Sequence, residues 1–276
     1  MARSRSRLLL ILIVLAVAFF LRSRPSSRVA VDEQSSADTT DQGRFRPTVQ
    51  EGLGASVAIL LDQSGSMEDP PQGGAGQPKY AIAREAIAQV LAQTDSFVAA
   101  QTGFPVNVGL YVFARRVERV LPIAPYNRDS LRSVLESLPE PSGSTAIGDA
   151  MEVATRDLYS AGTIRKYLLV VTDGENTSGR APEEVAREIN RRSEGAVKLY
   201  MVAFDVDAAK FGFVSEVRGT VLEAHNALAL RASLDTLYRG RILAEAIDAG
   251  EDLPARPDTS TKVLAPSRPA PTPRPR

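Results

Sequence analysis

An apolar run that ends abruptly in oxygen-bearing side chains is the feature that most constrains the fold of this chain. Residues 57–61 are apolar without any polar alternation, which is typical of a strand buried on both faces in a parallel sheet. Asp62, Ser64 and Ser66 follow directly, at alternate positions. A carboxylate and two hydroxyls at the end of a buried strand indicate a metal-binding loop, provided that other segments supply further ligands.

The rest of the sequence alternates between strand and helix patterns. Residues 167–171 form a second fully apolar run, residues 79–100 carry apolar side chains at helical spacing, and residues 117–123 carry the charges expected of an edge strand. Further strands are expected at 106–113, 197–204 and 221–222, and further helices from Asn127, from Thr145, and at 182–192, 211–217 and 228–247. This alternation predicts an α/β fold with a doubly wound, mostly parallel central sheet flanked by helices.

Composition excludes several classes of site. The chain has 276 residues, 43% of them hydrophobic and 24% charged, which suits a soluble domain with one full core. It has no Cys, so disulfides, thiolate zinc sites and Cys nucleophiles are excluded. His225 is the single His, which excludes metal sites built from several His. The net charge of zero gives no reason to expect a nucleic-acid partner.

Both ends of the chain differ in composition from its centre. Residues 8–21 lack polar side chains and are flanked by Arg on both sides, so residues 1–22 are expected to be a membrane anchor or signal segment. We favour an uncleaved single-pass anchor with the domain on the extracytoplasmic side. Cleavage after the small residues at 16–18 is the rival interpretation, and a buried core helix is the third. Residues 23–52 are predicted to be a disordered tether and residues 248–276 a disordered Pro/Arg-rich tail, which leaves 53–247 as the folded domain.

The predicted topology brings more oxygen ligands to the end of the first strand. If the second apolar run lies beside the first, Asp173 is next to Asp62, and Thr145 begins the helix that leads into that run. Asp62, Ser64, Ser66, Thr145 and Asp173 are hard ligands, which favour magnesium, with manganese or calcium as alternatives, over zinc. Only two of the five carry charge, so we expect an affinity of about 10⁻⁴ to 10⁻³ M. A remaining coordination position could accept a carboxylate from a partner.

Each of these residues also has an interpretation that involves no metal. Ser64 and Ser66 are common in turns, Thr145 is a good helix N-cap, and Asp173 with Gly174 is a frequent turn dipeptide. The metal site is inferred from their combination at consistent strand ends.

Three stretches of the sequence carry a family resemblance. They are D-Q-S-G-S-M at 62–67, G-S-T-A-I-G-D-A at 143–150 and V-V-T-D-G-E-N at 170–176. In order and spacing they resemble the metal-ion-dependent adhesion site of von Willebrand factor type A (VWA) domains, and the resemblance covers residues 55–247. It implies a Rossmann-like fold with one antiparallel edge strand.

The resemblance also implies ligand roles. Ser64, Ser66 and Thr145 would bind the ion through hydroxyls, and Asp62 and Asp173 directly or through water. Residues 221–230 resemble the last strand and helix of bacterial VWA proteins, which are typically membrane-anchored or exported.

Three functions compete for such a chain. We expect a membrane-tethered, metal-dependent protein-binding module for adhesion or complex assembly, whose partner supplies an Asp or Glu carboxylate. A regulatory subunit of an ATPase or chelatase-like assembly is the alternative. A metal-dependent phosphatase is disfavoured because Ser64 stands where a second carboxylate would be needed, and no nucleotide-binding or nucleophile-elbow motif occurs. His225 is interpreted as a surface or capping residue and Glu175 as part of the rim, so no catalytic residue is predicted.

Overall fold

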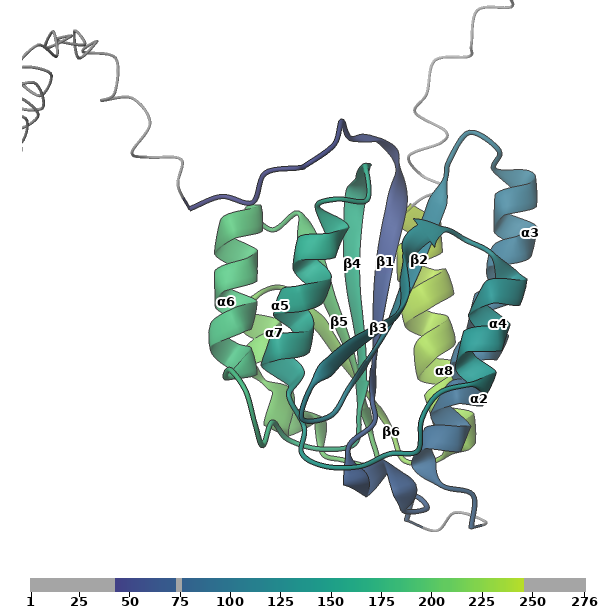
Figure 1. The fold of residues 1–276 in the computed structure, drawn as a ribbon, viewed down its shortest axis with the longest axis vertical. Coiled ribbons are helices and arrows are strands. Elements are labelled where there is room, and N and C mark those ends of the chain that lie inside the picture. Colours follow the sequence, from purple (N-terminus) through teal and green to yellow (C-terminus); the bar gives the residue numbers. More distant parts are fainter. Residues whose placement is uncertain (1–42, 73–75, 246–276) are drawn as a thin grey trace, which may run out of the picture. The chain divides into compact units, whose positions relative to one another are not determined.

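A six-stranded sheet forms the centre of the molecule (Figure 1). The computed structural model describes residues 43–72 and 76–245. The strands lie in the order β3-β2-β1-β4-β5-β6, and all neighbours are parallel except β2 and β3. Their bounds are β1 Gly52–Asp62, β2 Val106–Phe113, β3 Val117–Pro125, β4 Thr163–Thr172, β5 Val197–Phe204 and β6 Thr220–Ala224. The predicted doubly wound sheet and its antiparallel edge strand are confirmed.

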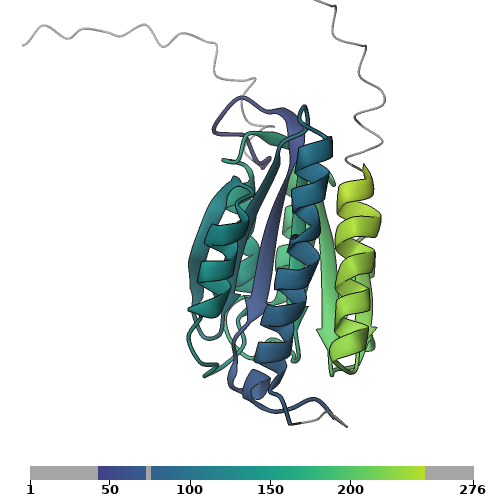
Figure 2. The same cartoon turned by 90° about the vertical axis from the view of Figure 1, so that its right-hand side faces the viewer.

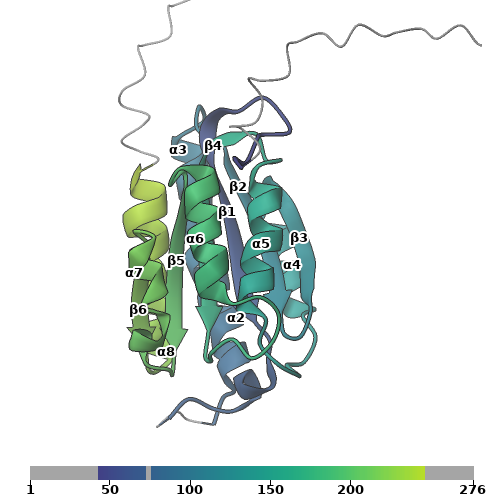
Figure 3. The ribbon, with the colours of Figure 1, turned by 90° about the vertical axis from the view of Figure 1, so that its left-hand side faces the viewer.

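Helices cover both faces of the sheet, as Figures 2 and 3 show from opposite sides. Val57, Ile59 and Leu61 of β1 pack in one core cluster with α2, α3, α4 and α8, whereas Ala58 and Leu60 pack in the other with α5, α6 and α7. The helix bounds are η1 Gly65–Glu68, α2 Lys79–Leu91, α3 Gln93–Ala100, α4 Arg128–Glu136, α5 Ile147–Leu158, α6 Pro182–Ser193, η2 Ala208–Phe211, α7 Phe213–Glu216, α8 Ala227–Leu237 and η3 Tyr238–Leu243. The absence of polar alternation in β1 thus follows from burial of both of its faces.

Three elements differ from the sequence-based expectation. The single helix expected at 79–100 is divided into α2 and α3 at Ala92, which keeps right-handed helical dihedral angles. β4 begins four residues before the apolar run, because its polar first half is stabilised by partners: Thr163 Oγ1 lies 2.7 Å from Ser56 Oγ, and buried Lys166 pairs with Glu51. The last helix continues as a π-helix, η3, after Leu237.

The chain enters the domain at the end of the sheet where the parallel strands start, opposite their carboxyl ends. Residues 44–51, which the sequence assigned to the tether, contact the domain here: the Phe45 amide donates to the Arg192 carbonyl at 3.0 Å, and the Phe45 ring stacks on Tyr159. The predicted anchor at 1–22 and the predicted tail at 248–276 lie outside the described residues. Within 43–72 and 76–245, no helix combines the length and apolarity needed to cross a membrane.

Candidate functional site

The predicted site residues meet where the winding of the sheet reverses. The chain passes from β1 to β2 on one side and later adds β4 on the other side of β1. Asp62 is the last residue of β1, and Asp173 directly follows the last residue of β4. Because these two strands are parallel neighbours, both carboxylates lie at the crevice where α/β sheets bind ligands.

The Asp62 carboxylate is fully buried and tightly held. Its Oδ1 accepts a hydrogen bond from the Ser64 amide at 2.7 Å, and its Oδ2 accepts one from Thr172 Oγ1 at 2.6 Å. Burial raises the pKa of Asp62 to about 6, even though hydrogen bonds from Thr172 and Ser64 lower it and Asp173 raises it slightly. The ionised form is therefore poorly solvated, and a bound cation would relieve that cost.

Two hydroxyls connect this carboxylate to the second one. Ser64 Oγ lies 3.2 Å from Ser66 Oγ, and Ser66 Oγ donates to Asp173 Oδ1 at 2.8 Å. Ser64 is buried, whereas Ser66 is exposed at the mouth of the site. The structure thus brings Asp62, Ser64, Ser66 and Asp173 into one polar cluster.

Thr145 lies on the loop that closes this cluster from the side. The positive φ of Gly143 (83°) turns the loop so that its carbonyl accepts from the Gly65 amide at 3.0 Å. The Thr145 amide donates to Thr177 Oγ1 at 2.8 Å, and Thr145 is 5% exposed. No hydrogen bond joins its hydroxyl to the other four predicted ligands within the described chain. The backbone bonds place it beside them.

Thr145 is not the N-cap of the helix that follows. The cap position of α5 is Ala146, whose side chain caps nothing. The Ile147 amide is instead satisfied by Asn176 Oδ1 at 2.8 Å. Thr145 is therefore not needed for capping, and Asn176 ties the loop after β4 to the start of α5.

Sequence reasoning missed a buried lysine side chain in the site. Lys79, the first residue of α2, is 7% exposed, and its Nζ lies 2.8 Å from Asp173 Oδ2 and 3.7 Å from Asp205 Oδ2. Asp205 directly follows β5, so it reaches the same sheet end. The signal was present in the sequence: Lys79 stands at a helix N-terminus, where the helix dipole disfavours a cation unless an anion faces it.

The donor set is suited to a hard divalent cation. Asp173 Oδ2 is buried, and within the described residues no hydrogen-bond donor is aligned with it, so its contact with Lys79 is an ion pair. Two carboxylates and three hydroxyls are oxygen donors throughout. No group of three or more His, Cys, Asp or Glu suited to a metal occurs in the part of the chain that the structure describes, so a metal here would depend on the hydroxyls.

The other two polar residues considered from the sequence lie at the surface. Glu175 is exposed and pairs with Lys210 at 2.7 Å. His225 is exposed and lies 3.5 Å from Glu223. The rim position of Glu175 stays a prediction, and His225 is a surface residue.

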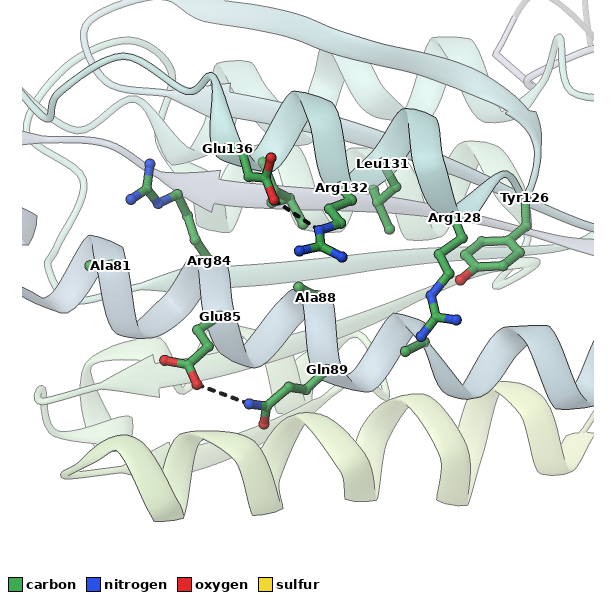
Figure 4. Close-up of a pocket in the computed structure, with 12 residues that line it drawn as sticks. Ala81, Arg84, Glu85, Ala88, Gln89, Tyr126, Arg128, Leu131, Arg132 and Glu136 are labelled. Atoms are coloured by element: carbon green, nitrogen blue, oxygen red, sulfur yellow. Dashed lines mark hydrogen bonds and ion pairs between the residues drawn. The ribbon is translucent and has the colours of Figure 1, made fainter.

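A groove lies elsewhere, between α2 and α4 (Figure 4). Its volume is about 440 Å³, and its walls include Ala81, Ala88 and Leu131. Charged side chains on its rim are paired locally, as Arg132 is with Glu136. None of the predicted ligands lines this groove, so the candidate chemistry stays at the strand ends.

Comparisons with known proteins agree with this fold. Residues 56–227 match the von Willebrand factor type A domain family. Among solved structures, BatB from Bacteroides thetaiotaomicron, described as a conserved hypothetical protein, is 21% identical, with a TM-score of 0.55 over 70% of this chain and 100% of that one. A von Willebrand factor type A protein from Catenulispora acidiphila is 18% identical, with a TM-score of 0.55 over 74% and 48% of the two chains. The D319A mutant of the PilB minor pilin from Streptococcus sanguinis is 12% identical, with a TM-score of 0.59 over 73% and 64%. The comparison with curated proteins finds no match.

Proposed function

This chain belongs to the von Willebrand factor type A domain family, and we propose that it is a membrane-tethered module that binds a protein partner through a divalent cation held by Asp62, Ser64, Ser66, Thr145 and Asp173. Domains of this family often mediate protein–protein interaction and metal-dependent adhesion. The proposal assigns that role to one defined site. Magnesium is the expected ion, with manganese or calcium as alternatives.

The observation that carries the proposal is the pair of buried carboxylates at the point where the winding reverses. Asp62 is ionised only at a cost, and Asp173 has a buried oxygen without an aligned hydrogen-bond donor. The charge of a buried carboxylate is costly unless a cation or a proton compensates it. Lys79 supplies one positive charge for the three carboxylates of Asp62, Asp173 and Asp205. The site therefore has an excess of negative charge that a divalent ion would offset.

The ion would serve as a Lewis acid that binds an anionic oxygen of the partner. Exposed Ser66 marks the side of the site from which a partner carboxylate could approach. Asp62 and Asp173 would contribute charge, and the hydroxyls would add ligands without neutralising the ion completely. An ion with only two anionic ligands retains affinity for a third, which is the property that partner capture requires.

Catalysis is not part of the proposal. In the described residues, the hydroxyls of the site have no neighbouring histidine, since the single His is exposed and lies beside Glu223, and the Asp173 carboxylate that accepts from Ser66 is already paired with Lys79. Hydrolytic or phosphoryl-transfer chemistry would need such a base or nucleophile pair. The extracytoplasmic, membrane-tethered location rests on residues 8–21 of the sequence.

A metal-dependent pull-down tests the proposal. The full chain is used as bait with magnesium or with a chelator, and Asp62→Ala is compared with Asp207→Ala. Asp207 is an exposed acid at the same end of the sheet, so its substitution makes the same charge change outside the site. Partners should be recovered by the wild type and by Asp207→Ala in magnesium, and lost with the chelator or with Asp62→Ala.

Calorimetry with magnesium or manganese separates the two halves of the proposal. Asp62→Ala should show no binding while its circular dichroism spectrum stays that of a folded domain. Stoichiometric binding by Asp62→Ala would refute the site. If the wild type binds the metal but no partner is recovered in a metal-dependent way, the metal site is supported and the partner-capture function is refuted.

A further inference from the structure

Charge is divided between the two ends of the sheet. At the end where the strands start and the chain enters, five stretches of connecting chain and adjoining helix or strand carry nine Arg and Lys against three Glu, a net charge of +6; these stretches are 44–51, 101–105, 159–166, 191–198 and 238–245. At the end that holds the candidate site, eleven Asp and Glu face five Arg and Lys, a net charge of −6; these segments are 62–72, 76–79, 114–116, 139–149, 173–183, 205–210 and 223–226. We call them the basic end and the acidic end.

Local ion pairs do not cancel the excess at the basic end. Each of its three acids already has a basic neighbour: Glu51 pairs with Lys166, Glu194 with Arg44, and Glu245 with Lys198. Part of the remaining positive charge lies at the surface on exposed Arg191 and Arg241, whereas Arg239 pairs with Asp235 of α8. The surplus is therefore available to an anionic partner.

The basic end also exposes apolar side chains. Val49 is 48% exposed and Ile164 is 55% exposed, and they are two of the three large apolar residues exposed in the described chain. They lie close together, since Val49 covers Gly162, two residues before Ile164. Arginines around exposed aliphatic side chains are typical of a surface that contacts the headgroup region of a bilayer.

The chain enters the domain at this same end. Only 22 residues separate Leu21, the last of the apolar segment, from Arg44. If residues 8–21 lie in a bilayer, the domain is held close to it, and the segment that leads to the bilayer joins the basic end.

We propose that the basic end of the domain rests against an anionic membrane surface, with the candidate site facing away from it. The inference rests on the membrane tether of the proposed function and adds an orientation to it. A basic residue near an anionic bilayer contributes about fivefold to partitioning, and the effect decays over a Debye length of about 10 Å at 0.1 M salt. A net charge of +6 is therefore enough to orient a domain that is already tethered.

The experiment exploits the absence of Cys, which makes a single introduced Cys a unique labelling position. Exposed Ser160, at the basic end, and exposed Ala209, at the acidic end, are each replaced by Cys in the full chain and labelled with a fluorophore. The protein is reconstituted into vesicles of phosphatidylcholine with phosphatidylglycerol, or of phosphatidylcholine alone, that contain a headgroup quencher. We expect the Ser160→Cys label to be quenched in the anionic vesicles and the Ala209→Cys label to remain unquenched.

Charge reversal supplies the matched comparison. Arg191→Glu with Arg241→Glu lowers the net charge of the basic end by four units and should reduce quenching of the Ser160→Cys label about tenfold or more. Arg115→Glu with Arg116→Glu makes the same change at exposed positions of the acidic end and should leave it unchanged. Raising the salt to about 1 M should mimic the first pair of substitutions.

The outcomes separate this inference from the proposed tether. Equal quenching of both labels, or quenching that ignores lipid charge, in protein that stays with the vesicles would overturn the orientation and keep the tether. Quenching that rises with protein density but not with anionic lipid would identify the acidic end of a second copy as the partner of the basic end. This result would also overturn the proposed orientation on the membrane. If the protein is lost from neutral vesicles but is retained on anionic vesicles in a salt-sensitive way, the membrane anchor is refuted and the contact between the basic end and anionic lipid is supported. If the protein is retained on neither kind of vesicle, both the anchor and the proposed orientation are overturned.

Discussion

Replacing Asp62 by Asn should make the metal-free domain less sensitive to pH. Asn keeps the shape of the side chain and an oxygen that accepts the Ser64 amide, but it carries no charge. In the wild type, burial raises the pKa of Asp62 from 3.8 to about 6. The folded state therefore binds a proton at a pH where the unfolded state has already lost it.

The sign and the size of the effect follow from this shift. Because the folded pKa is the higher one, ionisation of Asp62 opposes folding, and wild-type stability falls as the pH rises from about 4 through 6. A difference of about two pKa units corresponds to about 3 kcal/mol once both states are ionised. The unfolding free energy of Asp62→Asn minus that of the wild type should thus rise by about 3 kcal/mol between about pH 3 and pH 7. Saturating magnesium should reverse the order at pH 7, because only the wild type binds the ion.

Urea unfolding in a chelator, followed by circular dichroism over this pH range, measures the difference. Asp129→Asn serves as the control, since Asp129 is exposed and its substitution should give a nearly flat difference. A flat difference for Asp62→Asn as well would show that the carboxylate is not desolvated in the folded state. The main argument for a cation at this site would then be lost.

Three further substitutions test the surroundings of the site. Lys79→Met leaves Asp173 without its ion-pair partner, so the metal-free domain should lose about 3 kcal/mol of stability. Magnesium should bind about tenfold more tightly to this variant by calorimetry, because Lys79 no longer competes with the ion. Unchanged affinity would show that Lys79 does not compete with the ion. Thr172→Val removes the donor to Asp62 Oδ2 and should cost about 1–3 kcal/mol in urea unfolding at neutral pH without metal. A cost that vanishes in magnesium would show that the ion takes over this oxygen. Asn176→Ala removes the cap of the first turn of α5 and should cost about 1 kcal/mol and weaken magnesium binding several-fold; stability loss with full affinity would uncouple the cap from the site.

The core strands could be predicted because burial on both faces leaves a direct trace in the sequence. The apolar runs in β1 and β4 mark them as central strands, and two parallel central neighbours must place Asp62 and Asp173 together. The rule that ligands bind where the winding reverses then located the site. These inferences rest on local pattern and topology, which the sequence carries explicitly.

The residues that were missed depend on partners distant in the sequence. Lys79 is buried because Asp173 and Asp205, from two other elements, pair with it, and a charged residue at a helix start otherwise suggests a solvent-exposed position. The first half of β4 was missed for the same reason, since Lys166 is buried against Glu51 from the chain entry. Satisfied buried charges have no local signature, so three-dimensional contacts were needed to find them.

The central strand also has a mechanical consequence. β1 connects the entry of the chain at Gly52 directly to Asp62 in the candidate site, a distance of about 35 Å along the strand. A load applied between a bound partner and the tether would act along this strand, parallel to its neighbours β2 and β4. The hydrogen bonds of both ladders would then be loaded together in shear rather than broken one after another. If the chain is tethered through its N-terminal side and a partner binds at the candidate site, β1 can therefore carry tension between the two while the sheet remains folded.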